Sequence, residues 1–169
     1  SSQDFKPNRV EALKEIAQRF IEKRPNDNMG LTMFAGEAYT QCPLTTEHTV
    51  LMNLYNSVDC NMALRGVIDD GTAIGDGIMN AILRLKESQA KSKVIILLTD
   101  GVNNSGNISP QTAAEIAKKY GIRIYAIGIG RNGMAPYPLP TGGTAMLPVE
   151  IDEETMTKIS TETGGQYFR

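Results

Sequence analysis

Residues 93–100, KVIILLTD, form the feature that most constrains the fold of this 169-residue chain. Five aliphatic residues follow one another without alternating with polar ones, which is typical of a parallel strand covered on both faces. A parallel strand reaches its neighbour through a crossover connection, usually a helix. The run therefore predicts an α/β fold, and its last residue, Asp100, is a carboxylate at the end of the predicted strand.

Helical and extended segments alternate on both sides of this run. Helical spacing, capping residues and terminal glycines predict helices over residues 7–24, 45–58, 71–88, 109–121 and 152–165. Further strands are predicted over residues 29–36, 37–44, 122–130 and 166–169. The first two of these flank Gly36 and predict an antiparallel edge hairpin that ends at Pro43. Residues 1–169 are thus predicted to form one domain, a three-layer, Rossmann-like α/β sandwich with a mainly parallel sheet flanked by helices.

The apolar positions of three helices predict which faces pack inward. These positions are Val10, Leu13, Ile16, Ala17 and Phe20 in the first helix, Val50, Leu51, Leu54 and Val58 in the second, and Ile74, Ile78, Ile82 and Leu85 in the third.

Composition excludes several classes of function. The formal net charge is −2, with 17 basic and 19 acidic residues intermixed, so nucleic acid is not an expected partner. The aliphatic runs are far shorter than the ~20 residues that span a bilayer, and a soluble domain is expected. Cys42 and Cys60 lack the spacing of a metal site, which leaves two buried thiols or one disulfide. His48 is expected in the first turn of a helix, outside any catalytic site.

Two residues are candidates for a functional site. Ligands of doubly wound sheets bind at the carboxyl ends of the strands, where Asp100 is predicted to lie. The alternative is that Asp100 makes a turn with Gly101. Thr72 is predicted at the start of the helix of residues 72–87, and it either caps that helix or contributes its hydroxyl to a site.

The segment of residues 131–148 is predicted to be a functional surface loop. It is rich in Pro and Gly and too long for an ordinary connection. Met134, Tyr137 and Leu139 are candidates for contact with a partner, unless the prolines merely stiffen the connection. Residues 128–133, GIGRNG, match a dinucleotide-binding pattern, but prolines follow where that pattern requires a helix, which excludes this interpretation.

Several stretches resemble a known family. VIILLTDGVNNSG and DDGTAIGDGI are similar to two metal-binding motifs of von Willebrand factor A domains, and the order of elements agrees over essentially the whole chain. DFKPNRVEALK, MFAGEAYTQCPLTTEH and IGRNGMAPYP resemble more closely the A domains of bacterial Bat (Bacteroides aerotolerance) proteins. The resemblance implies a parent protein that is anchored in the bacterial inner membrane, is linked to stress tolerance and carries this domain in the periplasm.

The resemblance also implies a metal-ion-dependent adhesion site. In the family, a Thr and an Asp from separate loops join an Asp-x-Ser-x-Ser motif around Mg²⁺ or Mn²⁺, and the matching residues here are Thr72 and Asp100. Mg²⁺ prefers hard oxygen ligands at about 2.1 Å, and neutral hydroxyl ligands leave it able to attract a carboxylate from a partner protein. The expected partner-binding rim consists of Asp70, Gly71, Gly101, Asn103, Met134 and Tyr137.

One part of the family pattern is absent from this sequence. The Asp-x-Ser-x-Ser motif and its strand would precede DFKPNR, but the chain begins SSQDF. In the family that strand lies at the centre of the sheet, between the strands at residues 29–35 and 93–99. We therefore expect this fragment alone to bind Mg²⁺ or Mn²⁺ weakly or not at all. Three outcomes are expected as alternatives: the two neighbouring strands pair directly, another chain donates a strand, or residues outside this sequence fill the gap. Exposed central edges would invite self-association.

The sequence favours a protein-interaction module over an enzyme. The expected partners are other proteins, each offering an acidic residue that completes the metal shell, with no small-molecule substrate. The alternative is a Mg²⁺-dependent phosphotransfer or phosphatase enzyme that uses Asp100, although Val102 and Asn103 stand where such an enzyme would need a second acid. A third possibility is a structural scaffold whose metal site is dispensable.

Overall fold

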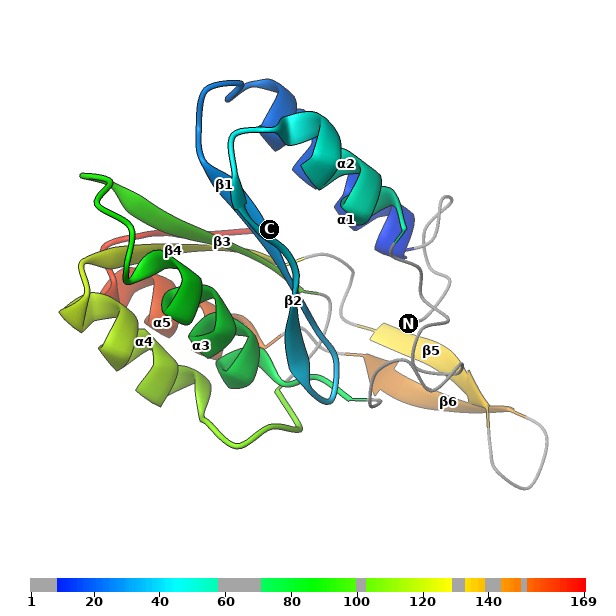
Figure 1. Ribbon diagram of the computed structural model, residues 1–169. Helices are drawn as coiled ribbons and strands as arrows, with labels where there is room; N and C mark the ends of the chain where they lie inside the picture. The colour runs from blue at the N-terminus through cyan, green and yellow to red at the C-terminus, as the bar shows by residue number, and fades with distance from the viewer. Residues whose placement is uncertain (1–8, 58–70, 100–102, 129–132, 139–143, 150–151) are drawn as a thin grey trace.

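The computed structural model describes residues 9–57, 71–99, 103–128, 133–138, 144–149 and 152–169, with the backbone alone for residues 9–13, 133–138 and 144–149. The elements follow the alternation predicted from the sequence (Figure 1). In chain order they are α1 (Arg9–Glu22), β1 (Met29–Phe34), β2 (Ala38–Thr45), α2 (His48–Asn56), α3 (Ile74–Leu85), β3 (Lys93–Thr99), α4 (Pro110–Lys119), β4 (Ile122–Gly128), β5 (Gly133–Pro138), β6 (Thr144–Val149), α5 (Glu153–Glu162) and β7 (Tyr167–Phe168).

A parallel sheet of order β3-β4-β7 forms the centre of the fold. β3 pairs with β4 from Lys93↔Ile122 to Thr99↔Gly128, without a shift in register. β4 pairs with β7 in the same direction. Helices α3, α4 and α5 pack together beside this sheet (Figure 1). The predicted α/β architecture is confirmed.

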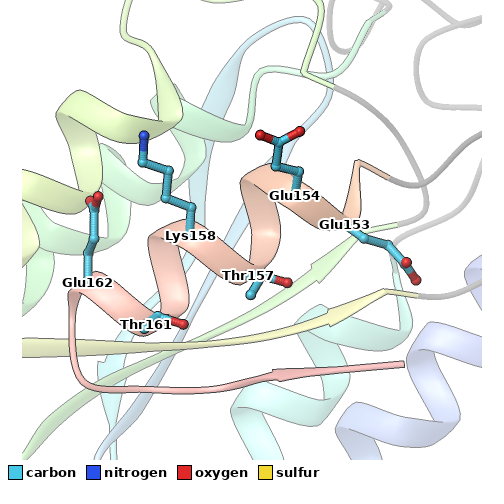
Figure 2. Close-up of a pocket in the computed structure, with 6 residues that line it drawn as sticks. All are labelled: Glu153, Glu154, Thr157, Lys158, Thr161 and Glu162. Atoms are coloured by element: carbon cyan, nitrogen blue, oxygen red, sulfur yellow. The ribbon is translucent and has the colours of Figure 1, made fainter.

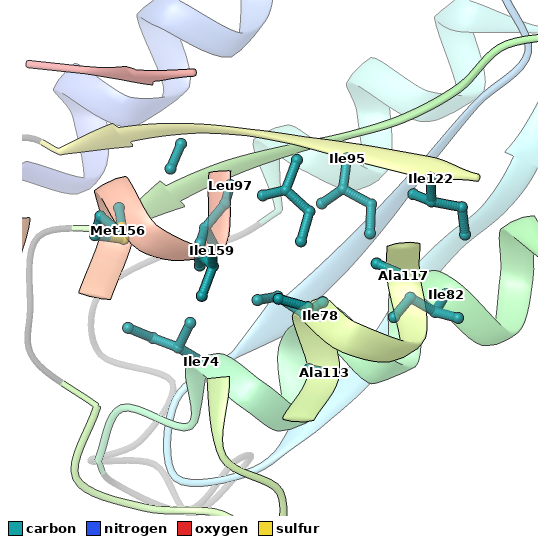
Figure 3. Close-up of a cluster of buried hydrophobic side chains, with 13 residues drawn as sticks. Ile74, Ile78, Ile82, Ile95, Leu97, Ala113, Ala117, Ile122, Met156 and Ile159 are labelled. Carbon is teal, nitrogen blue, oxygen red and sulfur yellow. The ribbon is translucent and has the colours of Figure 1, made fainter. Parts of the chain in front are cut away.

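The core lies between the parallel sheet and these three helices (Figure 3). Ile74, Ile78 and Ile82 of α3 are buried there, as their spacing predicts, and Leu85 packs against them. β3 contributes Ile95 and Leu97 to the same cluster. Small residues of α4 allow it to approach α3 closely; they are Ala113, Ala114 and Ala117.

The opposite face of β3 is less covered than the sequence predicts. Ile95 and Leu97 are buried, whereas Val94 is 37% exposed and Ile96 and Leu98 are half-buried. Five aliphatic residues in a row predict burial on both faces, but the described part of the chain fully buries one. Residues 94–98 are all aliphatic, yet their burial alternates along the strand.

β1 and β2 form the antiparallel hairpin predicted from Gly36. β2 runs on to Thr45, so the prediction that it ends at Pro43 is wrong. The register shifts between the pairs Met29↔Thr45 and Leu31↔Cys42, which places one extra residue in β2. Such a bulge accommodates Pro43, because proline has no N–H to donate to the ladder.

Within the described residues, β1 pairs with β2 alone and β3 with β4 alone. Each of these strands therefore has one edge without a described partner strand. Helix α3 contacts β1, β2 and β3, so it connects the hairpin with the parallel sheet. These two edges belong to the strands between which the family resemblance places a further strand.

The second helix turns a different face inward than its spacing predicts. Leu51 and Tyr55 are buried in α2, whereas Val50 is 50% exposed, so its predicted inward position is wrong. The reason is that α2 packs on β1 and β2 with the i, i+4 pair that Leu51 and Tyr55 form. Val58 lies outside the described residues.

In α1, Ile16 and Phe20 are exposed, contrary to the prediction, while Ile21 is buried against Leu51 and Cys42. The cause is that α1 packs mainly on α2, and only Ile21 at its end reaches the cluster that includes Cys42 of β2. The side chains of Val10 and Leu13 are outside the described part.

Cys42 is a free, buried thiol, and burial raises its pKa; Cys60 is outside the described residues. His48 begins α2, as predicted, and its Nε2 lies 2.6 Å from the carbonyl oxygen of Asp27. That contact ties α2 to the turn after α1.

The segment predicted as a loop over residues 131–148 contains an antiparallel hairpin instead. β5 pairs with β6 from Gly133↔Val149 to Pro138↔Thr144. Its closest contacts within the described residues are internal, and Figure 1 shows it extending away from the helices. Prolines are tolerated in a two-stranded ribbon because each strand has a free edge.

Candidate functional site

Two loops meet at the carboxyl end of β3. The first, residues 71–73, leads into α3, and the second begins at the end of β3 and continues through residues 103–109 into α4. Thr99, the last residue of β3, is buried. This is the end of the sheet at which the sequence predicts a site.

Backbone and amide hydrogen bonds hold the two loops together. The Thr72 N–H donates to Asn104 Oδ1 at 2.8 Å. The Thr72 carbonyl accepts from the N–H groups of Asn104 at 2.9 Å and Ser105 at 3.3 Å. Ser105 Oγ in turn donates to Asn104 Oδ1 at 2.9 Å. Thr72 is therefore fixed by residues that follow Asp100 closely in the chain.

Asn103, and not Thr72, accepts the hydrogen bond from the first backbone N–H group of α3. The helix begins at Ile74, and the preceding Ala73 makes no side-chain cap. The Ile74 N–H instead donates to Asn103 Oδ1 at 2.8 Å, across 29 positions of sequence. The prediction that the helix starts at Thr72 is wrong for this reason. Within the described residues, no hydrogen bond engages the Thr72 hydroxyl.

Two glycines permit this close approach of the loops. Gly71 has φ +130°, a conformation that L residues rarely adopt, and a Cβ there would collide with Ser105 Oγ. At Gly75, in the first turn of α3, a Cβ would collide with the carbonyl oxygen of Ile108. Gly71 and Gly75 therefore serve the packing of one loop on the other.

The structure brings together three of the predicted site residues. Gly71, Thr72 and Asn103 lie in or beside the hydrogen-bonded contact between the loops. Asp70, Asp100 and Gly101 lie outside the described residues. Asp100 directly follows Thr99 and is three residues from Asn103, which limits its Cα to about 10 Å from that of Asn103.

Met134 and Tyr137 are described by their backbone positions in β5. They are three positions apart, and positions an odd number apart belong to opposite faces of a strand. A partner that contacts both would therefore have to reach both faces of the hairpin. Leu139 lies outside the described residues. Their contact with a partner stays a prediction.

Sequence reasoning missed Asp76, Asn104 and Gly106, which also shape this site. The Asp76 carboxylate accepts from the N–H groups of Asn107 and Ile108, and Asn104 pairs with Thr72. The polar run NNSGN after the apolar strand was a signal, because a loop of such residues forms many side-chain to backbone hydrogen bonds.

The described part of the site offers hydroxyl and carbonyl oxygens, the donor type that Mg²⁺ and Mn²⁺ prefer. Among the described residues, no cluster of three His, Cys, Asp or Glu side chains could hold a metal ion unaided. A bound ion would need Thr72 together with carboxylates such as Asp100, which are not among the residues described.

A separate surface hollow occurs on α5 and is lined by this helix alone (Figure 2). Its residues are Glu153, Glu154, Thr157, Lys158, Thr161 and Glu162. None of them belongs to the two loops around Thr72. The hollow brings together no side chains from separate elements, and we assign it no role.

Residues 1–169 match the family model of the von Willebrand factor type A domain. A protein of Borreliella burgdorferi is 33% identical over 95% of this chain and 47% of its own length. The chain spans about half the length of the curated relatives it matches.

None of the helices among the described residues combines the length and apolar character needed to cross a bilayer.

Solved structures extend the comparison. A serine-substituted form of an aerotolerance-related membrane protein from Bacteroides fragilis superposes with a TM-score of 0.83 and 27% identity, over 99% of this chain and 84% of that one. Proximal thread matrix protein 1 of the mussel byssus, solved with zinc in its metal-ion-dependent adhesion site, gives a TM-score of 0.63 and 30% identity, over 74% of this chain and 32% of that one.

Proposed function

The chain belongs to the von Willebrand factor type A domain family, and from this premise we propose that it binds partner proteins through a divalent cation held by Thr72 and Asp100. Domains of this family typically mediate protein interactions and commonly bind a divalent metal. The proposed output is binding and not turnover. A carboxylate from the partner would complete the shell of the ion.

Two features of Thr72 carry this proposal: its backbone is hydrogen-bonded, and its hydroxyl has no hydrogen bond to any described residue. Asn103 caps α3 and Asn104 pairs with the Thr72 backbone, so neither task requires the hydroxyl. A threonine fixed by its backbone, with no described hydrogen bond to its hydroxyl, is suited to donate an oxygen to a cation. The zinc-occupied site of the mussel protein supports a metal at this position, while Mg²⁺ or Mn²⁺ is our proposal for this chain.

We propose further that the parent protein is anchored in a bacterial membrane and that this domain faces the periplasm. The similarity to an aerotolerance-related membrane protein supports a membrane-associated parent with a role in stress tolerance. Asp70, Gly71, Gly101, Asn103, Met134 and Tyr137 form the proposed partner-binding rim around the ion.

The proposal predicts metal-dependent capture of partner proteins. Full-length wild-type protein and the Thr72→Ala variant would be used as baits on membrane and periplasmic extracts, with Mg²⁺ or with EDTA. We expect partners that the wild type retains in Mg²⁺, releases in EDTA and loses on Thr72→Ala. The control is Thr157→Ala, the same change on the exposed face of α5, which should leave capture intact.

If neither EDTA nor Thr72→Ala changes which partners are captured, the result would contradict the proposal and favour a structural scaffold. Mg²⁺-dependent hydrolysis of an aryl phosphate, abolished by Asp100→Ala, would favour the phosphatase alternative. A beryllofluoride adduct on Asp100 would identify that residue as its nucleophile.

Among the described residues, β1 and β3 each have one edge without a partner strand, and this leads us to propose that residues 1–169 alone self-associate. Both edges and the half-buried outer face of β3 offer backbone and apolar groups to a second copy. Light scattering over a concentration series should show a mass that rises above that of one chain. Val94→Lys, which adds a charge at a 37% exposed position of β3, should reduce this rise. A single-chain mass at every concentration would contradict the prediction.

A further inference from the structure

We infer that Asp76 is a positioning residue that holds residues 103–108 against Thr72, and this inference rests on the proposed function. Asp76 lies in the first turn of α3 and is half-buried. Its Oδ1 accepts from the N–H of Asn107 at 2.9 Å and from the N–H of Ile108 at 2.9 Å. Its Oδ2 lies 3.1 Å from the same Asn107 nitrogen. Hydrogen bonds to a charged acceptor are stronger than those between neutral groups.

The loop is shaped to fit this carboxylate. Gly106, immediately before the two donating residues, has φ +97°, and a Cβ there would lie 2.8 Å from the Asp76 Cγ. A side chain at position 106 would therefore force the loop and the Asp76 carboxylate apart. The contact depends on a glycine on one side and on a short carboxylate on the other.

The loop segment that Asp76 holds is the one that fixes Thr72. Asn107 and Ile108 donate hydrogen bonds to Asp76, and earlier in the same loop Asn103 and Asn104 accept hydrogen bonds from Ile74 and Thr72. The loop is thus anchored to the start of α3 at both ends of residues 103–108.

Asp76 is not itself proposed as a ligand of the ion, because both of its oxygens face backbone N–H groups. Its role is to keep Thr72 in one arrangement before the ion binds. Residues that orient metal ligands in this way typically contribute about 10- to 100-fold to metal affinity. Asp76 also lies at a helix N-terminus, where a negative charge is favourable in any case, so the test must separate positioning from stability.

The test measures the Mn²⁺ dissociation constant of the full-length protein by electron paramagnetic resonance. Asp76→Asn is expected to weaken Mn²⁺ binding about 10-fold or more. Ser109→Ala is the matched control, since it removes the cap that accepts from the Thr112 N–H at 3.1 Å and destabilises α4 without touching the Asp76 contact. This control should lower the melting temperature but change Mn²⁺ affinity less than about twofold. Equal affinities of Asp76→Asn and wild type would overturn the inference.

A double-mutant cycle with Thr72→Ala provides a readout that a purely structural role would not move. If Asp76 acts through the loop on Thr72, Asp76→Asn should cost markedly less affinity in the Thr72→Ala background than in the wild type. Additive losses would overturn the inference. Unchanged Mn²⁺ binding in Thr72→Ala and Asp100→Ala would instead show that the proposed function has failed, and the inference with it.

Gly106→Ala tests the same contact from the loop side if Asp76→Asn does not fold. It should weaken Mn²⁺ binding and speed hydrogen exchange at the amides of Asn107 and Ile108. Faster exchange at these amides with unaltered Mn²⁺ affinity would show that the contact holds the loop without positioning the site, and would overturn the inference.

Discussion

Asp100→Ala in the full-length protein is expected to weaken Mg²⁺ binding by more than about 100-fold. The estimate follows because the loss of outer-shell partners already costs about 10- to 100-fold, and Asp100 is proposed to contact the ion directly. A carboxylate supplies the negative charge that neutral hydroxyl ligands lack, so its removal should affect affinity more than Thr72→Ala does. Isothermal titration calorimetry with Mg²⁺ measures both.

Glu154→Ala is the matched control for this experiment. It removes the same charge from an exposed position on α5, outside the two loops, so it separates a local ligand effect from a change in net charge. We expect its Mg²⁺ affinity to match that of the wild type. An Asp100→Ala protein that binds Mg²⁺ as tightly as the wild type would exclude Asp100 as a ligand.

Ile78→Ala is expected to lower the free energy of unfolding by about 2–5 kcal/mol, the range for truncating a buried isoleucine. Ile78 is 1% exposed and lies in the core between α3 and the parallel sheet (Figure 3). Its truncation leaves a cavity at the layer that supports the start of α3. Urea denaturation followed by circular dichroism measures the change.

Leu83→Ala serves as the control on the same helix. Leu83 is 45% exposed, so the same kind of truncation should cost much less than at Ile78. Equal losses at the two positions would contradict the assignment of Ile78 to the core. A small loss of unfolding free energy for Ile78→Ala would contradict the packing of α3 on the parallel sheet through Ile78.

Most of the fold was predictable because its elements carry strong local signals. The isoleucines of α3 recur at helical spacing, and Ser109 and Asp152 cap α4 and α5 by accepting from N–H groups three residues on. Local signals of this kind depend only on residues close in sequence, so they predict helices without knowledge of the tertiary structure.

Errors arose where distant parts of the chain decide the outcome. Val50 and Leu51 are both apolar, and only the position of α2 on β1 and β2 determines which of them is buried. The hairpin of β5 and β6 was missed because its prolines favour a loop in sequence reasoning. A two-stranded ribbon tolerates those prolines at its free edges.

The sequence named candidate residues for the site, but it did not predict the hydrogen bonds that hold the two loops together. Motif resemblance selected Thr72 and Asp100. The structure describes Thr72 beside the loop that follows β3, while the role of both residues as ligands stays a prediction. The use of Asn103 as the cap of α3 was not predictable, because its partner Ile74 is 29 positions away. The same separation explains why the contacts of Asp76 with Asn107 and Ile108 were missed.

A crystal structure of the full-length protein with Mn²⁺, located by its anomalous scattering, tests the central claim most directly. We predict one peak at a bonding distance of about 2 Å from both the Thr72 hydroxyl and the Asp100 carboxylate. A peak that contacts neither side chain, or carboxyl and hydroxyl groups too far apart to share one ion, would contradict the claim.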